Sequence, residues 1–188
     1  LFGSELYESF RKIKAAFDPH NLLNPGKVVD APAMTENLRY GAAYRTAPIQ
    51  THYDFTREGG FAGAVEMCTG MGICRKTQEG TMCPSYMVTK DEEHSTRGRA
   101  NALRAALSGQ LPLAELTSKR MHDVLDLCLE CKGCKGECPA NVDMAKIKYE
   151  FLAHYQAKHG VPLRSRMFAH IETLNRWGSR FAPVSNWL

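Results

Sequence analysis

The sequence contains the run Cys128-Leu-Glu-Cys131-Lys-Gly-Cys134-Lys-Gly-Glu-Cys138-Pro139. Its four cysteines have the spacing C-x2-C-x2-C-x3-C and are followed by proline, an arrangement that holds iron–sulfur clusters. Three thiolates on one tight loop can each reach a different iron of a 4Fe–4S cubane. The fourth lies on an outgoing turn and points away. The run therefore predicts a 4Fe–4S cluster.

The fourth cysteine of the run indicates a second cluster. In two-cluster bacterial-type ferredoxins, this cysteine ligates the other cluster. Segment 68–74 reads Cys-Thr-Gly-Met-Gly-Ile-Cys, which is C-x2-C-x2-C with Met71 in place of the middle cysteine, and Cys83-Pro84 follows. Exchange of the fourth cysteines predicts one cluster on Cys83, Cys128, Cys131 and Cys134. The other is then held by Cys68, Cys74 and Cys138.

The second cluster lacks a fourth thiolate, which leaves three outcomes open. Loss of the labile iron gives 3Fe–4S, whereas hydroxide or an oxygen or nitrogen side chain would retain a site-differentiated 4Fe–4S. A thioether is a weak ligand for iron, so Met71 itself is not expected to coordinate. In the third outcome there is no second cluster, and the run holds one cubane alone. Gly70 and Gly72 suit either cluster because they let backbone N–H groups approach the sulfides.

Zinc and disulfides explain the cysteines less well. Structural zinc sites use ligand pairs separated by a longer spacer, and the run would crowd a single ion. The cysteines number seven, which is odd, and no secretory signal is visible, so a disulfide framework is disfavoured. We expect metal-bound thiolates in a reducing compartment. A cytoplasmic location follows, with peripheral attachment at the inner membrane as an alternative.

The composition indicates a soluble protein, with 44% hydrophobic residues and a mean hydropathy of −0.35. No apolar run approaches the roughly 18 residues of a membrane span. The formal net charge of +4 counts cysteines as neutral. Each oxidised cluster with its thiolates carries roughly −2, which brings the loaded protein near zero. Lysine and arginine are therefore expected to compensate cluster charge and not to bind nucleic acid.

The hydrophobic pattern predicts a mostly α-helical chain, with the clusters on loops between helices. A first helix begins after Ser4 and ends at Asp18-Pro19, and its apolar stripe consists of Leu6, Phe10, Ile13 and Phe17. Later N-caps are expected at Ser95 or Thr96, at Thr117 or Ser118, and at Asn141. The third of these helices closes at Gly160, and a fourth covers 164–177. Residues 29–67 predict an irregular connector with at most short strands.

Asp18-Pro19-His20-Asn21-Leu22-Leu23-Asn24-Pro25-Gly26-Lys27 resembles the closing signature of FAD-linked oxidases, flavin dehydrogenases that oxidise D-2-hydroxy acids. Met82-Cys83-Pro84-Ser85, Ser95-Thr-Arg-Gly-Arg-Ala100 and the cysteine segments follow in order. Together they resemble bacterial FAD and iron–sulfur fusion dehydrogenases of the long, cluster-containing D-2-hydroxyglutarate dehydrogenase type. The chain begins with Leu1 and not methionine, which fits an excised piece of a longer polypeptide.

The resemblance implies four parts. Residues 1–28 are the C-terminal tail of a flavin domain, 29–67 a connector, 68–160 an α-helical ferredoxin-like dicluster domain, and 161–188 a helical exit segment toward a cysteine-rich acceptor domain. In the intact enzyme, FAD would take a hydride from C2 of a small 2-hydroxy acid, and the clusters would relay its electrons singly. The segment itself would hold no catalytic residue, and homo-oligomerisation stays open.

Four further residues are candidates for cofactor contact. The resemblance places Asn24 and Lys27 near the flavin or the substrate mouth. Arg97 and Arg99 would contact cluster sulfides or a flavin pyrophosphate, where a guanidinium fork is useful; the alternative is a helix N-terminus with solvated charges. The histidines at 94, 122, 154, 159 and 170 are equally compatible with surface positions.

Two other functions remain open. The chain could be a separate iron–sulfur subunit of a glycolate or glycerol-3-phosphate dehydrogenase complex, although the flavin-domain tail argues against this. It could also be a structural interaction domain in which the clusters only brace helices.

Overall fold

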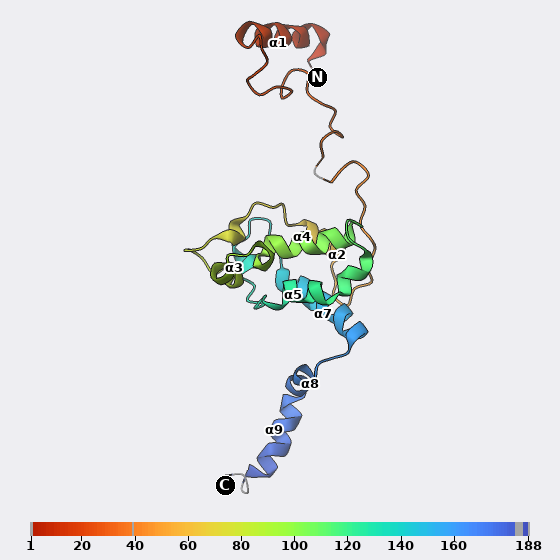
Figure 1. Ribbon diagram of the computed structural model, residues 1–188, viewed down its shortest axis with the longest axis vertical. Coiled ribbons are helices and arrows are strands. Elements are labelled where there is room, and N and C mark those ends of the chain that lie inside the picture. Colours follow the sequence, from red (N-terminus) through yellow and green to blue (C-terminus); the bar gives the residue numbers. More distant parts are fainter. Residues whose placement is uncertain (1, 39, 183–185, 188) are drawn as a thin grey trace. The chain divides into compact units, whose positions relative to one another are not determined.

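The computed structural model describes residues 2–38, 40–182 and 186–187 (Figure 1). The chain divides into two compact units, residues 1–45 and 46–188. Helices are the regular elements of the described residues, and no strand occurs among them, which confirms the predicted mostly α fold. None of the described helices combines the length and apolar character needed to cross a membrane.

The first unit is built on α1 (Gly3–Phe17), which begins at Gly3, one residue before the expected cap. Ser4 does not cap it: the cap position is Phe2, and no side chain bonds to the free N–H groups. None of the helix residues is buried within this unit, although the apolar stripe predicted from the sequence is present.

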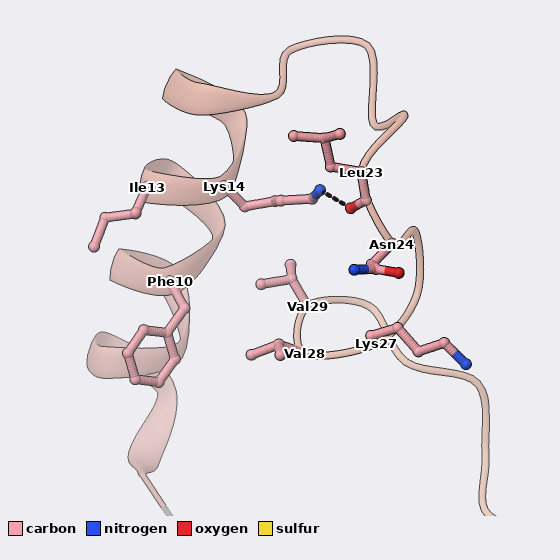
Figure 2. Close-up of a pocket in the computed structure, with 8 residues that line it drawn as sticks. All are labelled: Phe10, Ile13, Lys14, Leu23, Asn24, Lys27, Val28 and Val29. Atoms are coloured by element: carbon pink, nitrogen blue, oxygen red, sulfur yellow. Dashed lines mark hydrogen bonds between the residues drawn. The ribbon is translucent and has the colours of Figure 1, made fainter.

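Asp18 ends α1 and turns the chain back along the helix. Its carboxylate accepts hydrogen bonds from the backbone N–H groups of Leu22 and Leu23, both at 2.8 Å, and pairs with Lys14. The Lys14 hydrogen bond is the main cause that lowers the pKa of Asp18 to about 2, although burial opposes this shift. The returning segment and α1 enclose a pocket of about 550 Å³ (Figure 2).

The second unit contains eight α-helices among its described residues. They are α2 (Phe61–Glu66), α3 (Pro84–Thr89), α4 (Thr96–Leu107), α5 (Lys119–Asp126), α6 (Gly133–Glu137), α7 (Met144–His159), α8 (Leu163–Ala169) and α9 (Ile171–Arg180). Short 3-10 turns cover Thr56–Glu58, Ile73–Arg75, Glu92–His94 and Leu113–Thr117. The cysteine-bearing loops lie between these helices, as the sequence predicted.

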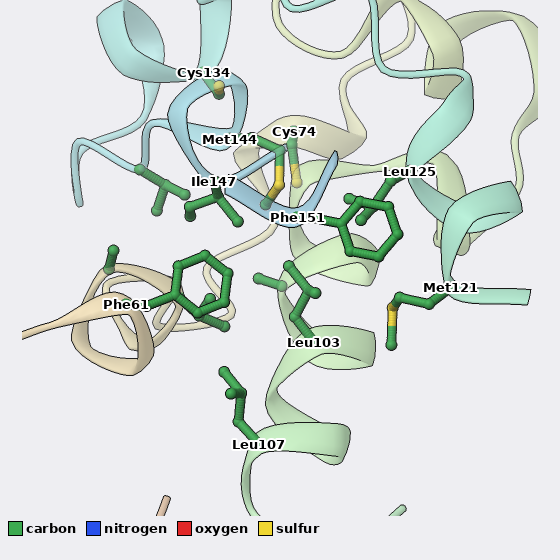
Figure 3. Packing of buried hydrophobic residues seen from close by; sticks show 14 of the residues in the cluster. Phe61, Cys74, Leu103, Leu107, Met121, Leu125, Cys134, Met144, Ile147 and Phe151 are labelled. Carbon is green, nitrogen blue, oxygen red and sulfur yellow. The ribbon is translucent and has the colours of Figure 1, made fainter. Parts of the chain in front are cut away.

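The core of this unit forms around α4, which packs against α2 and α5 (Figures 1 and 3). Leu103 of α4 is fully buried, and Phe151 of α7 and Phe61 of α2 lie in the same cluster (Figure 3). Residues 56–67, expected to be irregular, instead contain a 3-10 turn and α2. Their apolar residues are buried because they complete this core.

Two of the predicted caps are confirmed and one is wrong. The side chains of Ser95 and Ser118 accept backbone hydrogen bonds at the starts of α4 and α5. Asp143, and not Asn141, caps α7, because Asn141 adopts a left-handed conformation with φ of 52° in the preceding turn. The helix expected over 164–177 is two helices, α8 and α9, which separate at His170. The expected exit segment 181–187 lies partly outside the described residues.

Candidate metal centre

The seven cysteines of the second unit are free thiols that line two separate cavities. The first cavity is lined by Cys83, Cys128, Cys131 and Cys134. The second is lined by Cys68, Cys74 and Cys138. The structure thus brings together the same two sets of cysteines that the sequence assigned to two clusters. Ligation by these residues stays a prediction.

The spacing of the sulfur atoms argues against a single metal ion in either cavity. In a tetrahedral zinc site with Zn–S bonds of about 2.3 Å, neighbouring sulfurs lie about 3.8 Å apart. Within the described part of the chain, no group of three cysteines is arranged so that it could hold a single metal ion. A multi-iron cluster separates its thiolates more widely than one ion does, so the cavities fit a cluster better.

The N-terminus of α4 lies between the two cavities, and Thr96 lines both. The hydroxyl Oγ1 of Thr96 lies 3.1 Å from Sγ of Cys83, and the backbone N–H of Arg97 donates to Sγ of Cys74 at 3.4 Å. A helix N-terminus carries a partial positive charge and stabilises anions. This end of α4 is therefore placed to stabilise thiolates in both cavities.

Arg99 lies in the wall of the first cavity and is only 1% exposed. Its guanidinium donates to the carbonyl of Val124 at 3.1 Å and to Ser85 Oγ at 3.0 Å, and it lies 3.8 Å from Sγ of Cys83. Among the described residues, no carboxylate pairs with it. A buried cation without an anion is costly, so the first cavity fits an anionic group such as a thiolate-bound cluster.

Arg97 lines the second cavity and differs from Arg99 in being paired. Its guanidinium holds Glu92 through two bonds of 2.7 and 3.1 Å, and donates to the carbonyl of Gly70 at 3.3 Å. Gly98 allows this arrangement, because a Cβ there would lie 1.9 Å from the carbonyl oxygen of Glu92. The charge of Arg97 is thus largely balanced before any cluster binds. Neither arginine is simply a solvated residue at a helix end.

The loop that carries Cys128 is fixed by Lys148 of α7, which sequence reasoning missed. Its Nζ donates to the carbonyls of Asp126 and Cys128 at 3.1 and 2.7 Å and pairs with Glu130 at 3.0 Å. Glu130 and Lys132 adopt left-handed conformations, which tightens the loop between the cysteines. The only signal in the sequence was a lysine on the buried face of a helix.

Glu137 fixes the segment that carries Cys83. Its carboxylate accepts from the backbone N–H of Thr81 at 2.6 Å and of Met82 at 3.2 Å. Glu137 itself lies at the end of α6, next to Cys138. These bonds hold the cysteine segments of the two cavities together.

Burial raises the pKa of four cysteine thiols, namely Cys74, Cys83, Cys128 and Cys134. Hydrogen bonds from Thr96 to Cys83 and from the N–H of Arg97 to Cys74 oppose this effect. Without bound cations, these buried thiols are therefore favoured over thiolates, which matches sites whose ligands ionise as they take up metal.

Met71 occupies the position where the second cavity would need its fourth thiolate. The residue lines that cavity, yet its side chain is 65% exposed. Gly70 and Gly72 on either side have φ of 84° and 83°, a conformation that favours glycine. The loop therefore has the tight form of a cluster-binding loop, with solvent access at its middle position.

Asn24 and Lys27 lie in the first unit, where both line the pocket beside α1. Figure 2 shows the ammonium of Lys27 directed away from α1. Apolar side chains make up most of the remaining lining, namely Phe10, Ile13, Leu23, Val28 and Val29. The structure brings neither residue into a charged cluster, and their contact with a flavin stays a prediction.

Two family models match the chain. Residues 65–143 match the 4Fe-4S dicluster domain, and residues 1–28 match the C-terminal domain of FAD linked oxidases. The two matches follow each other in the order that the sequence resemblance predicted. The predicted resemblance and the predicted iron–sulfur cofactors are thereby confirmed.

The relatives found for this chain include enzymes and an iron–sulfur subunit of such systems. A D-2-hydroxyglutarate dehydrogenase of Escherichia coli (strain K12) is 31% identical over 92% of this chain, and one of Pantoea ananatis is 29% identical over the same share. The chain spans about a fifth of the length of these relatives, 20% in both cases. A glycolate oxidase iron-sulfur subunit of Escherichia coli is 35% identical over 40% of this chain and 16% of the relative. No solved structure matches the chain.

Proposed function

We propose that the dicluster domain relays electrons one at a time from a reduced flavin to an acceptor further along the same polypeptide. The observation that carries this proposal is the buried Arg99, an unbalanced cation facing four cysteines. An iron–sulfur cluster bound in each cavity supplies reversible one-electron chemistry, which a hydride-accepting flavin needs for passing on a pair of electrons.

In this proposal the seven cysteines are the cluster ligands, four in the first cavity and three in the second. Arg99 and Thr96 stabilise negative charge on the sulfurs of the first cavity. Arg97, through its backbone N–H, does the same for Cys74. Burial of Cys74, Cys83 and Cys134 in the apolar core lowers the local dielectric constant, which strengthens these electrostatic interactions. The domain's own residues thus position the clusters and set their reduction potentials.

The first unit supports a flavin as the proposed electron source. Its match to the end of an FAD linked oxidase supports a flavin domain as the partner of the pocket beside α1. We propose that Asn24 and Lys27 lie near the flavin in the intact enzyme. The named relatives support a D-2-hydroxy acid as substrate, with D-2-hydroxyglutarate as the first candidate. The chain alone should then show no turnover of hydroxy acids unless a flavoprotein is added.

A second candidate is the iron–sulfur component of a glycolate-oxidising system. The similarity to a glycolate oxidase iron-sulfur subunit favours it. The match of residues 1–28 to a flavin-oxidase domain favours the fused enzyme instead. Comparison of D-2-hydroxyglutarate and glycolate as electron donors to the full-length enzyme distinguishes the two.

The deciding experiment is EPR spectroscopy of anaerobically purified protein, before and after dithionite, with iron and sulfide analysis. We expect a signal near g of about 2.01 in the untreated sample and about seven irons per chain, the result for one 3Fe–4S and one 4Fe–4S cluster. About eight irons without that signal would indicate a site-differentiated second cluster and would retain the proposed ligand sets. About four irons would contradict the assignment of the second cavity.

The relay role needs a separate test by redox potentiometry. The clusters should be reducible at potentials that a flavin can supply. Midpoint potentials far below any flavin couple, together with no reduction by substrate in the full-length enzyme, would contradict the relay and favour a bracing role.

A further inference from the structure

A group of three potential metal ligands lies outside both cysteine cavities. His52, Glu150 and His154 bring one nitrogen or oxygen atom each to within 4.8 Å of one another. Glu150 and His154 are one turn apart on α7, whereas His52 comes from the irregular segment before α2. None of the three lines the cavities that contain the cysteines. The group is therefore distinct from the proposed cluster sites.

Glu150 is the centre of this group. Its side chain is fully buried, and Oε1 lies 3.1 Å from Nδ1 of His52 and 3.0 Å from Nε2 of His154. The backbone N–H groups of His52 and Tyr53 also donate to the carboxylate, at 2.9–3.0 Å. Burial opposes ionisation of Glu150, but these hydrogen bonds outweigh it and hold its pKa below the ordinary value. One carboxylate oxygen thus lies within 3.1 Å of a nitrogen of each imidazole.

The hydrogen-bonding of His154 is incomplete. Its Nε2 is buried, and it has no aligned hydrogen-bond partner in the described part of the chain despite its closeness to Glu150. A buried imidazole nitrogen without a partner is costly, and a metal ion on its lone pair would remove that cost. The ring of His52 lies 5.5 Å from that of His154 and is edge-on to it. Both rings therefore lie beside the same carboxylate.

The distances suit a first-row divalent ion. Zinc bonds of about 2.0–2.1 Å to nitrogen and oxygen place neighbouring ligand atoms of a tetrahedron about 3.3 Å apart. The two distances from Oε1 are slightly shorter than this edge, and all three ligand atoms lie within 4.8 Å of one another, so side-chain shifts would be needed to place them around one ion. The side chain of His52 is 62% exposed, which leaves water access for a fourth ligand.

We propose that His52, Glu150 and His154 bind a divalent transition-metal ion, with Zn²⁺ the best fit to two imidazoles and one carboxylate. The ion would fasten the segment around His52 to α7. This segment leads directly into α2 and the loop that carries Cys68. The site would thus stabilise the start of the dicluster domain from outside its cavities.

Zinc binding tests the proposal. The cluster-loaded chain, without a polyhistidine tag, is treated with a mild chelator and titrated with ZnCl₂ under anaerobic conditions, with zinc and iron counted by elemental analysis. We expect one zinc per chain with iron content unchanged. His52→Ala and His154→Ala should each weaken binding at least tenfold. The matched control His20→Ala, an exposed histidine of the first unit, should bind like the unaltered chain.

X-ray absorption at the zinc edge distinguishes zinc bound by His52, Glu150 and His154 from zinc bound by cysteines. The distinction does not depend on how much iron the chain holds. Nitrogen and oxygen neighbours at about 2.0–2.1 Å with no sulfur near 2.3 Å would support the proposal. A sulfur shell, zinc uptake matched by iron loss, equal binding by all variants, or no stoichiometric zinc would overturn it.

Discussion

The two cysteine cavities share one helix end but differ in how their charge is balanced. The first has four cysteines around a fully buried Arg99 that no described carboxylate neutralises. The second has three cysteines, an exposed Met71 and an Arg97 already paired with Glu92. The first is therefore suited to a permanent, fully ligated anionic cluster, and the second to a cluster with an accessible position.

The largest expected effect is the loss of the first cluster when one of its four cysteines is replaced. Cys134→Ser should remove the first cluster, with a loss of about four irons per chain, because serine is a poor substitute for a buried thiolate. The second cluster's EPR signal should persist if the cavities are independent sites. Elemental analysis and EPR provide the measurement.

Met71→Leu is the matched control for this loss, since it removes no thiol and keeps a similar volume. It should leave the iron content unchanged. Equal iron loss in both variants would mean that the two cavities do not hold separate clusters.

A second substitution should give the second cavity four cysteines, the same number as the first. Met71→Cys supplies the missing thiolate, so the second cavity should hold a complete 4Fe–4S cluster. The signal near g of about 2.01 should disappear, and the iron content should rise by about one per chain. Persistence of that signal with unchanged iron would show that residue 71 does not face the labile corner of the cluster.

The unequal charge balance should appear in the reduction potentials. Arg99→Met removes a buried positive charge beside the first cluster, so the more negative reduced state is disfavoured and the midpoint potential falls. A buried charge-assisted hydrogen bond is worth about 1.5–3 kcal/mol, which corresponds to a fall of roughly 60–130 mV for one electron. Arg99→Lys should recover part of the loss. Potentiometry that finds no shift would contradict the role given to Arg99.

The smallest effect is expected in the second cavity. Arg97→Gln should lower the second cluster's potential by less than about 60 mV, because Arg97 is partly exposed and its backbone N–H to Cys74 is retained. The first cluster should shift even less. A larger effect from Arg97 than from Arg99 would reverse the comparison between the cavities.

Local patterns predicted a large part of this structure. The cysteine spacings and the caps at Ser95 and Ser118 depend on neighbouring residues, so the sequence alone suffices to find them. The cap of α7 was misassigned because Asn141 and Asp143 are both good capping residues, and the left-handed turn at Asn141 decides between them.

Interactions between distant segments could not be predicted in this way. Lys148 lies 20 residues from the Cys128 carbonyl that it binds, and Glu150 lies 98 residues from His52. Such contacts depend on how α7 packs against the rest of the unit. The Glu150–His154 pair at helical spacing was visible in the sequence, but its third member was not.

Thr96 lines both cavities, so a change at this end of α4 is expected to affect the reduction potentials of both proposed clusters. Because the same helix end stabilises negative charge on both sides, moving or weakening it alters both potentials together. An electron on one proposed cluster also places negative charge near the other, and like charges repel. In the proposed relay, reduction of one cluster is therefore expected to make reduction of the other harder.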